Sequence, residues 1–130
     1  MSMNDVLANV LNTIKNQKNI ASNEAFARPT SKLVTECLKL MQKFGYIGEF
    51  EIIEDGRGGV YRIKLTHKFN NCGVIKPRFP MKIGDVEKWE RRFLPARNVG
   101  ILMVSTSKGV MDHRKVIEKG VGGVLLGFVY

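Results

Sequence analysis

The chain has 130 residues, which is the size of one domain or of two small lobes. Hydrophobic residues make up 44% of it and charged residues 25%, a composition that excludes wholesale disorder. No apolar run approaches the roughly 18 residues of a membrane-spanning helix. The first residues lack the basic start and apolar stretch of a secretory signal, so we expect a cytoplasmic protein.

The charge balance is the unusual feature of the composition. Lys and Arg number 21 against 12 Asp and Glu, a formal net charge of +9. A surface this basic points to a polyanionic partner, with nucleic acid the first candidate and an anionic membrane face the second. A soluble protein that is merely basic is the alternative. Residues 1–75 carry a net +3 and residues 76–130 a net +6, so the excess lies mainly in the second half.

The first half of the chain predicts the element order α-β-α-β-β. Hydrophobic residues at helical spacing predict a helix that starts after a cap at Asn4 and fades near Asn19. A second helix begins after a cap at Thr30 or Ser31 and ends at Phe44, where Gly45 supplies the left-handed position. We expect strands at residues 25–28, 46–54 and 60–66, the last two joined by a glycine-rich turn over 55–59.

The second half predicts a mostly β lobe with small helices, after a joint at residues 70–73. Two prolines three residues apart exclude a helix and a central strand from residues 74–80, which we expect to be extended. The remaining elements, in chain order, are a basic helix over 86–93 capped by Asp85, a buried strand over 99–104, a loop over 105–109, a helix from a cap at Asp112 to Lys119, and a final strand over 124–130.

No pattern in the sequence supports a metal site or catalysis. Cys37, Cys72, His67 and His113 do not stand at metal-ligand spacing, and no cysteine and histidine have a reason to meet. The glycine-rich stretches match no nucleotide-binding motif. We therefore expect no cofactor and no enzyme activity.

The segment Ser105-Thr106-Ser107-Lys108-Gly109 is the most informative in the chain. Hydroxyl groups and loop amides donate hydrogen bonds to phosphate, ribose and base edges, and the lysine adds charge. Short side chains also fit the shallow minor groove of RNA, which displays 2′-hydroxyls. Because Ser and Thr equally favour capped turns, the residues alone leave both interpretations open.

Basic residues outside this segment are further candidates for phosphate contacts. Lys76 and Arg78 lie in the extended segment, where an arginine can fork onto a phosphate. Arg28 and Lys32 flank a helix N-terminus, which itself attracts anions. Trp89 lies in the basic helix over 86–93, and packing of its ring is favoured over stacking on a base.

Several segments together resemble the family of ribosomal protein eight of the small subunit. The resemblance covers essentially the whole chain, in order. Its Lys-Pro-Arg-Phe-Pro stretch and its Glu-Lys-Trp-Glu helix resemble the archaeal and eukaryotic branch more than the bacterial one. The segments that carry it are Leu7–Asn9, Pro29–Leu33, Gly45–Phe50, Lys76–Pro80, Leu94–Arg97, Ser105–His113 and Gly120–Gly123.

This resemblance implies a two-lobe α+β protein that binds RNA, with an N-terminal lobe over residues 1–70 and a C-terminal lobe over 71–130. It implies binding to a stem in the central domain of small-subunit ribosomal RNA, help in assembling that domain, neighbouring ribosomal proteins as partners, no membrane, and a monomer when free. The implied RNA-binding residues are Ser105, Thr106, Ser107, Lys108 and Gly109, with Gly122 and Gly123 close to them and Thr30, Ser31 and Lys32 as a secondary contact.

Two other classes of function stay open on the residues alone. An RNA-processing or nucleotide-using enzyme would need a pocket with strongly shifted titratable groups. A DNA-binding regulator would need a recognition helix, whereas the basic helix over 86–93 is short and is followed by Pro95.

Overall fold

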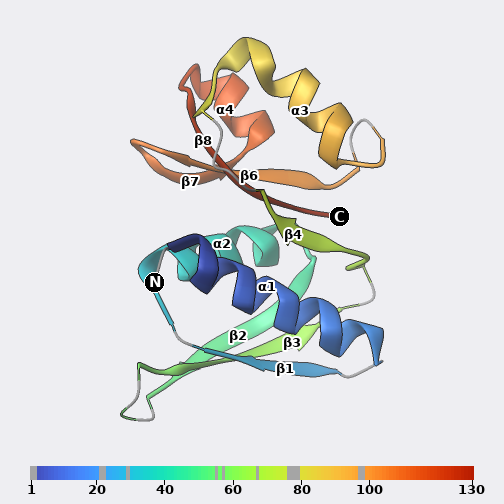
Figure 1. The fold of residues 1–130 in the computed structure, drawn as a ribbon, viewed down its shortest axis with the longest axis vertical. Coiled ribbons are helices and arrows are strands. Elements are labelled where there is room, and N and C mark those ends of the chain that lie inside the picture. Colours follow the sequence, from blue (N-terminus) through green and yellow to red (C-terminus); the bar gives the residue numbers. More distant parts are fainter. Residues whose placement is uncertain are drawn as a thin grey trace.

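Four layers of secondary structure are stacked along the long axis of the molecule (Figure 1). A three-stranded sheet is covered by two helices, and these helices also pack under a second sheet that carries two shorter helices on its far side. The computed structural model describes residues 3–20, 23–28, 30–54, 56, 58–66, 68–75, 80–96 and 99–130. The expected α+β fold of two lobes is confirmed.

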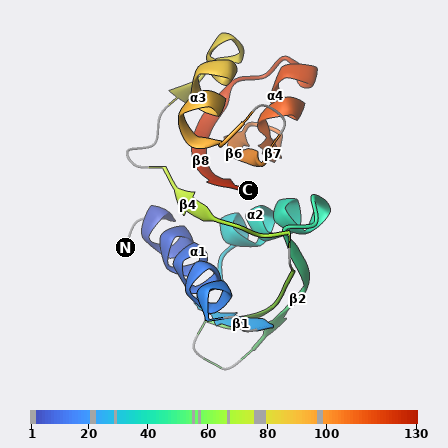
Figure 2. The ribbon, with the colours of Figure 1, turned by 90° about the vertical axis from the view of Figure 1, so that its right-hand side faces the viewer.

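The first lobe has the predicted order α-β-α-β-β. Its sheet is antiparallel with the strand order β1-β3-β2, and its two helices lie on one side of it (Figure 2). The elements are α1 (Met3–Asn19), β1 (Glu24–Ala27), α2 (Lys32–Lys43), β2 (Ile47–Ile53) and β3 (Val60–Leu65).

The ends of α2 follow the sequence closely. The Ser31 side chain accepts a hydrogen bond from the Val34 N–H at 3.2 Å, which makes Ser31 the N-cap. Phe44 is the C-cap, and Gly45 has a φ of 81°. The start of α1 was predicted wrongly, because the helix already includes Asn4, the expected cap. A capping preference locates a helix end only to within a residue or two.

The second lobe is built around an antiparallel sheet with the strand order β4-β8-β6-β7, and β5 pairs with the start of β8. Its helices α3 and α4 pack against β6 on the side away from the first lobe (Figure 1). The elements are β4 (Cys72–Val74), β5 (Pro80–Met81), the 3-10 turn η1 (Ile83–Asp85), α3 (Val86–Phe93), β6 (Ile101–Thr106), β7 (Gly109–Asp112), α4 (His113–Lys119) and β8 (Gly123–Val129).

Three short strands were missed, namely β4, β5 and β7. Each has four residues or fewer, too few to show an alternating pattern, and each is held by pairing with β6 or β8. The strand expected over 99–104 starts two residues later, because Gly100 has a φ of 83° and Val99 is exposed.

The two aspartates expected to cap the short helices lie at the N-cap positions but make no capping hydrogen bond through their side chains. For Asp85 the reason is its backbone, which is helical with a φ of −93° and a ψ of −7° as it leaves η1. A capping residue needs extended backbone to turn its side chain towards the first free N–H groups.

The two lobes share a hydrophobic core. Along β6, Ile101 and Met103 face α1 and α2, whereas Leu102 and Val104 face α3 and α4. This alternation is the two-residue period of a strand that is covered on both faces. One core cluster therefore runs from the first sheet through α1 and α2 to the underside of the second sheet.

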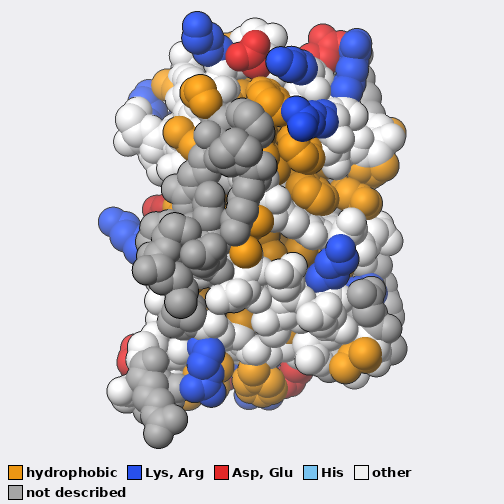
Figure 3. Space-filling model, viewed as in Figure 1, with side chains coloured by type: hydrophobic (Ala, Val, Ile, Leu, Met, Phe, Trp, Pro, Cys, Tyr) orange, Lys and Arg blue, Asp and Glu red, His pale blue; other side chains and the backbone are white. Residues whose placement is uncertain are grey.

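The packing role expected for Trp89 is confirmed. Its side chain is only 6% exposed, and its ring begins a stacked row that continues through Phe93 and Phe128 to Tyr130. Figure 3 shows hydrophobic side chains gathered over this lobe, with Lys and Arg side chains mainly along the upper end and rim of the same face.

Candidate nucleic-acid interface

The segment 105–109 forms the tip of a β-hairpin. Ser105 pairs with Val110 and Thr106 with Gly109, so only Ser107 and Lys108 make the turn. The predicted loop was therefore too long, because cross-strand pairing draws Ser105, Thr106 and Gly109 into β6 and β7. The result is a narrow, supported tip rather than a free loop.

The hydroxyl groups of the hairpin tip divide into two kinds. Thr106 Oγ1 donates to the Gly109 carbonyl at 2.8 Å and accepts from the Lys108 N–H at 3.1 Å, so this residue closes the turn. Within the part of the chain that the structure describes, Ser105 and Ser107 have no side-chain hydrogen bond, and Ser107 and Lys108 are exposed. Two hydroxyls and one ammonium group are thus left for a ligand.

Gly122 and Gly123 lie at the start of β8, and Gly123 packs against the base of this hairpin. A Cβ at Gly123 would collide with the Ser105 carbonyl and would lie 2.8 Å from a methyl group of Val104. At Gly122 a Cβ would come within 3.1 Å of the Met81 carbonyl. The close backbone approach expected for these glycines is therefore present, and it brings β8 against the candidate site.

The start of α2 carries the second group of predicted site residues. Thr30 Oγ1 donates to the Gly58 carbonyl at 2.6 Å, and the Ser31 hydroxyl caps the helix, so both side chains serve the fold. Lys32 and Arg28 are exposed. What this region offers to solvent is therefore positive charge rather than hydroxyl groups.

A buried tyrosine fixes the position of this segment. The Tyr61 hydroxyl donates to the Ser31 carbonyl at 2.9 Å, accepts from the Ser31 N–H at 3.1 Å and lies 2.6 Å from Thr35 Oγ1. Tyr61 is fully buried on β3. The helix start is thereby tied to the first sheet, a connection that the sequence analysis missed.

Both groups of predicted residues lie towards the same edge of the molecule. In Figure 1 the β6–β7 hairpin and the start of α2 both lie on the left. The packing of α2 against β7 fixes these two elements relative to each other. Lys76 and Arg78, the other two predicted residues, lie outside the described residues.

A buried histidine holds the helices of the second lobe against its sheet. His113 Nδ1 accepts a hydrogen bond from the Leu102 N–H at 3.1 Å, so its Nε2 carries the proton and donates to Glu90 at 2.7 Å. Burial lowers the pKa of His113, and the hydrogen bond to Glu90 opposes this only in part. His113 thus joins α3 and α4 to the start of β6 as a neutral side chain.

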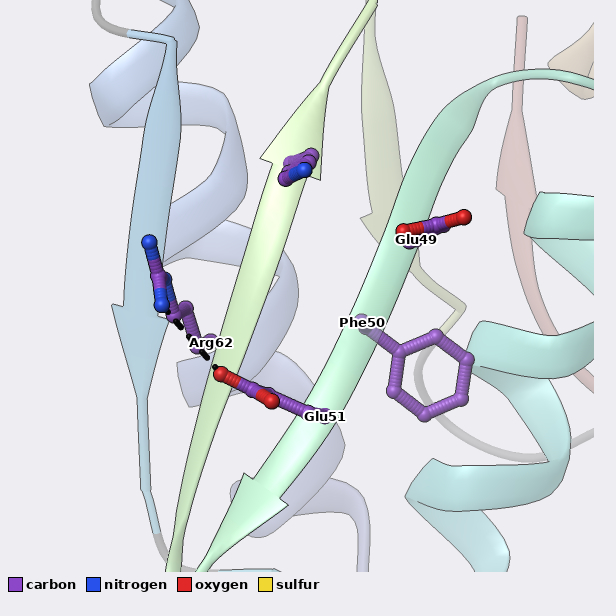
Figure 4. A pocket seen from close by; sticks show the side chains of 5 residues that line it. Glu49, Phe50, Glu51 and Arg62 are labelled. Atoms are coloured by element: carbon purple, nitrogen blue, oxygen red, sulfur yellow. Dashed lines mark hydrogen bonds and ion pairs between the residues drawn. The ribbon is translucent and has the colours of Figure 1, made fainter.

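An open hollow of about 210 Å³ lies elsewhere, on the outer face of the first sheet (Figure 4). Arg62 contacts Glu24 at 3.0 Å and Glu51 at 3.3 Å there, while Phe50 points away from this ion pair. The hydrogen bond from Arg62 lowers the pKa of Glu24. The opposite charges in these cross-strand ion pairs compensate each other. The hollow therefore resembles a solvated sheet face rather than a catalytic pocket.

The groups with shifted pKa values do not form a single site. Glu24 and Arg62 are exposed on the sheet, and burial holds the pKa of the Cys72 thiol at about 12 beneath α1. Among the described residues no group of three or more His, Cys, Asp or Glu could hold a metal ion. No described helix is long and apolar enough to cross a membrane.

The comparison with known protein families shows the family to which the chain belongs. A family model described as ribosomal protein S8 matches residues 5–130 of the chain. The chain belongs to this family. Members of the S8 family are small-subunit ribosomal proteins that bind ribosomal RNA, and the family is not one of enzymes. The protein therefore acts in translation, within the ribosome and beside other ribosomal proteins.

Proposed function

We propose that this S8-family protein binds a stem in the central domain of small-subunit ribosomal RNA and helps that domain to assemble. The observation that carries the proposal is the hairpin tip, where Ser105 and Ser107 keep their hydroxyls unbonded within the described chain, beside the exposed Lys108. Small hydroxyl side chains on a narrow tip suit a shallow minor groove lined with 2′-hydroxyls.

The start of α2 supports a secondary contact in this proposal. Arg28 and Lys32 place charge on the edge that also carries the hairpin, so one RNA can reach both. Such cations bind phosphates and fix the orientation of the protein on the RNA, while the hairpin hydroxyls supply the discrimination.

The proposal extends to the organisation of the chain. Residues 71–130 act as the main RNA-binding lobe, with Lys76 and Arg78 adding charge to it, and residues 1–70 act as the lobe of the secondary contact. We further propose that the free protein is a monomer and that it belongs to the archaeal and eukaryotic branch, on the segments quoted above.

The test is a binding titration of the double variant Ser105→Ala/Ser107→Ala against the central-domain stem, with a scrambled stem of equal length as competitor. Loss of two hydrogen bonds of about 1 kcal/mol each predicts affinity about 30-fold weaker. Far-UV circular dichroism of the variant should match that of the parent, because neither hydroxyl supports the fold.

The matched control is Thr13→Ala, which removes a hydroxyl group from α1 in the first lobe. That hydroxyl donates only to the Asn9 carbonyl of its own helix, at 2.8 Å, and alanine favours a helix at least as well. This variant should bind like the parent. If the double variant binds the stem as tightly as the control, the hairpin assignment is wrong. If the parent itself fails to prefer the stem over the scrambled competitor, the proposed RNA ligand is wrong.

A further inference from the structure

Two hollows lie along the junction between α2 and the second lobe. One, of about 240 Å³, is lined by Lys39 and Lys43 of α2 and by Lys115 of α4. The other, of about 300 Å³, includes Lys68 and Arg114 in its lining. Lys43 of the first hollow is followed in the chain by Phe44 of the second, and Arg114 of the second by Lys115 of the first, so the two hollows lie near each other. We call these five cations the interlobe seam.

The interlobe seam carries an unbalanced positive charge. Among the described residues that line the two hollows, the five cations face one carboxylate, that of Glu36. Within the same described part of the chain, Lys39, Arg114 and Lys115 have neither an ion pair nor a hydrogen bond. This differs from the outer face of the first sheet, where Arg62 is held between two glutamates.

The other two cations are fixed by groups that leave their charge uncompensated. Lys68 Nζ donates to the Phe44 carbonyl at 2.7 Å and lies 4.9 Å from the centre of the Tyr46 ring. Lys43 Nζ lies 5.9 Å from the centre of the Phe44 ring. Like charges gathered along one junction repel one another and destabilise the free protein unless an anion compensates them.

The apolar side chains of the first hollow are mostly covered, whereas the second hollow is also lined by the rings of Phe44, Tyr46 and Tyr130. Leu40 is 8% and Met111 5% exposed, and Val110 is half-buried. Protein interfaces are depleted in lysine, so a surface with five cations and one carboxylate fits a phosphate backbone better than a protein partner. A ligand here must gain its affinity from charge, as a phosphate backbone does.

The seam is also continuous with the hairpin tip. Strand β7 begins at the turn and its residues Val110 and Met111 line the first hollow. Four residues of strand span about 13 Å. Figure 2 shows α2 lying beneath β7 and α4 across this junction, so a strand of RNA that touches Lys108 can continue along β7 into the seam.

We propose that the interlobe seam is a second RNA-binding track, which holds the phosphates of a ribosomal RNA strand as it leaves the hairpin. This inference rests on the proposed function. It assigns to Lys39, Lys43, Lys68, Arg114 and Lys115 a role in affinity and orientation, and none in choosing the sequence of the RNA.

The experiment measures the salt dependence of binding to the central-domain RNA. Each phosphate contact on a duplex contributes about 0.9 to the slope of log affinity against log salt, so Lys39→Gln/Lys115→Gln should lower the slope by about 1.8. Between about 50 and 200 mM salt, the parent should lose about 12-fold more affinity than this variant does. The preference over a scrambled stem should stay unchanged.

The matched control is Lys64→Gln/Lys88→Gln, which removes the same charge from exposed lysines on the first sheet and on α3. Its slope should stay near that of the parent. An equal fall in both variants would refute the track, because net charge alone would then explain the effect. An unchanged slope in the seam variant would also refute it.

Two further outcomes distinguish a failure of this inference from a failure of the proposed function on which it rests. If the parent shows no preference for the stem, the proposed function fails, whatever the slopes are. If the parent prefers the stem and only binding to polyglutamate depends on Lys39 and Lys115, the proposed function stands. The seam would then serve an acidic protein, and the inference drawn here would be overturned.

Discussion

Replacing Tyr61 by Phe tests whether the first sheet holds the start of α2 in place. The variant removes one oxygen atom and leaves the buried ring in its core position. The Ser31 N–H then loses its acceptor, and the Ser31 carbonyl and Thr35 lose one partner each. Leaving such groups unsatisfied costs about 1–3 kcal/mol, so we expect a loss of about 2 kcal/mol in the free energy of unfolding.

This loss converts into a measurable shift in melting temperature. At about 2.1 cal/mol/K per residue, 130 residues give an unfolding entropy of about 0.27 kcal/mol/K. A loss of about 2 kcal/mol therefore lowers the melting temperature by about 7 °C. Thermal and urea denaturation, followed by circular dichroism, measure the same difference independently.

The control for this prediction is Tyr46→Phe. Tyr46 is also buried, at 7% exposed, but its hydroxyl has no hydrogen bond to any residue that the structure describes. This variant should change stability by less than about 0.5 kcal/mol. Equal effects of the two variants would show that the Tyr61 hydroxyl does not hold α2, and the reasoning about this segment would be wrong.

A glycine substitution and a change of pH give two further predictions about stability. Gly123→Ala should destabilise the protein by about 1–3 kcal/mol and weaken RNA binding, because its methyl group displaces the Ser105 backbone. Gly84→Ala, with open space around it, should be neutral, and a neutral Gly123→Ala would contradict the close packing. Because burial lowers the pKa of His113 below 6.5, the unfolded chain takes up the proton first. Stability should therefore fall from about pH 7 to 5.5, by at most about 1.4 kcal/mol per pH unit. The decline should be weaker in His113→Gln, and a flat profile in the parent would refute the assignment.

The fold class and the long elements could be predicted because their signals are local. Helical spacing and caps located α2 to within a residue, and glycine and proline positions separated the strands. The shortest strands could not be found, because β4, β5 and β7 exist only through pairing with β6 and β8. Their sequences are too short to favour a strand by themselves.

The candidate site could be predicted only where its residues are consecutive. Ser105 to Gly109 form one segment, and the structure separated the hydroxyl that closes the turn from the two that do not. His113 and Glu90 are 23 positions apart, and the sequence offered His113 only as a candidate metal ligand or as a candidate partner of a nucleophilic cysteine. The interlobe seam draws on residues from 39 to 115, so no local pattern could have revealed it.

The hydrophobic core that spans both lobes holds them at a fixed separation. Because Met103 and Leu126 of the second sheet are packed with α1 and α2, a hinge between the lobes would expose apolar surface to water. The separation between the hairpin tip and the start of α2 is therefore set before any RNA arrives. When an RNA presents two contact points at this separation, the protein loses no further conformational freedom on binding. Any other RNA must bend to fit. If the hairpin tip and the start of α2 are the two RNA contacts proposed above, selection among RNA conformations depends on the distance at which the protein holds them.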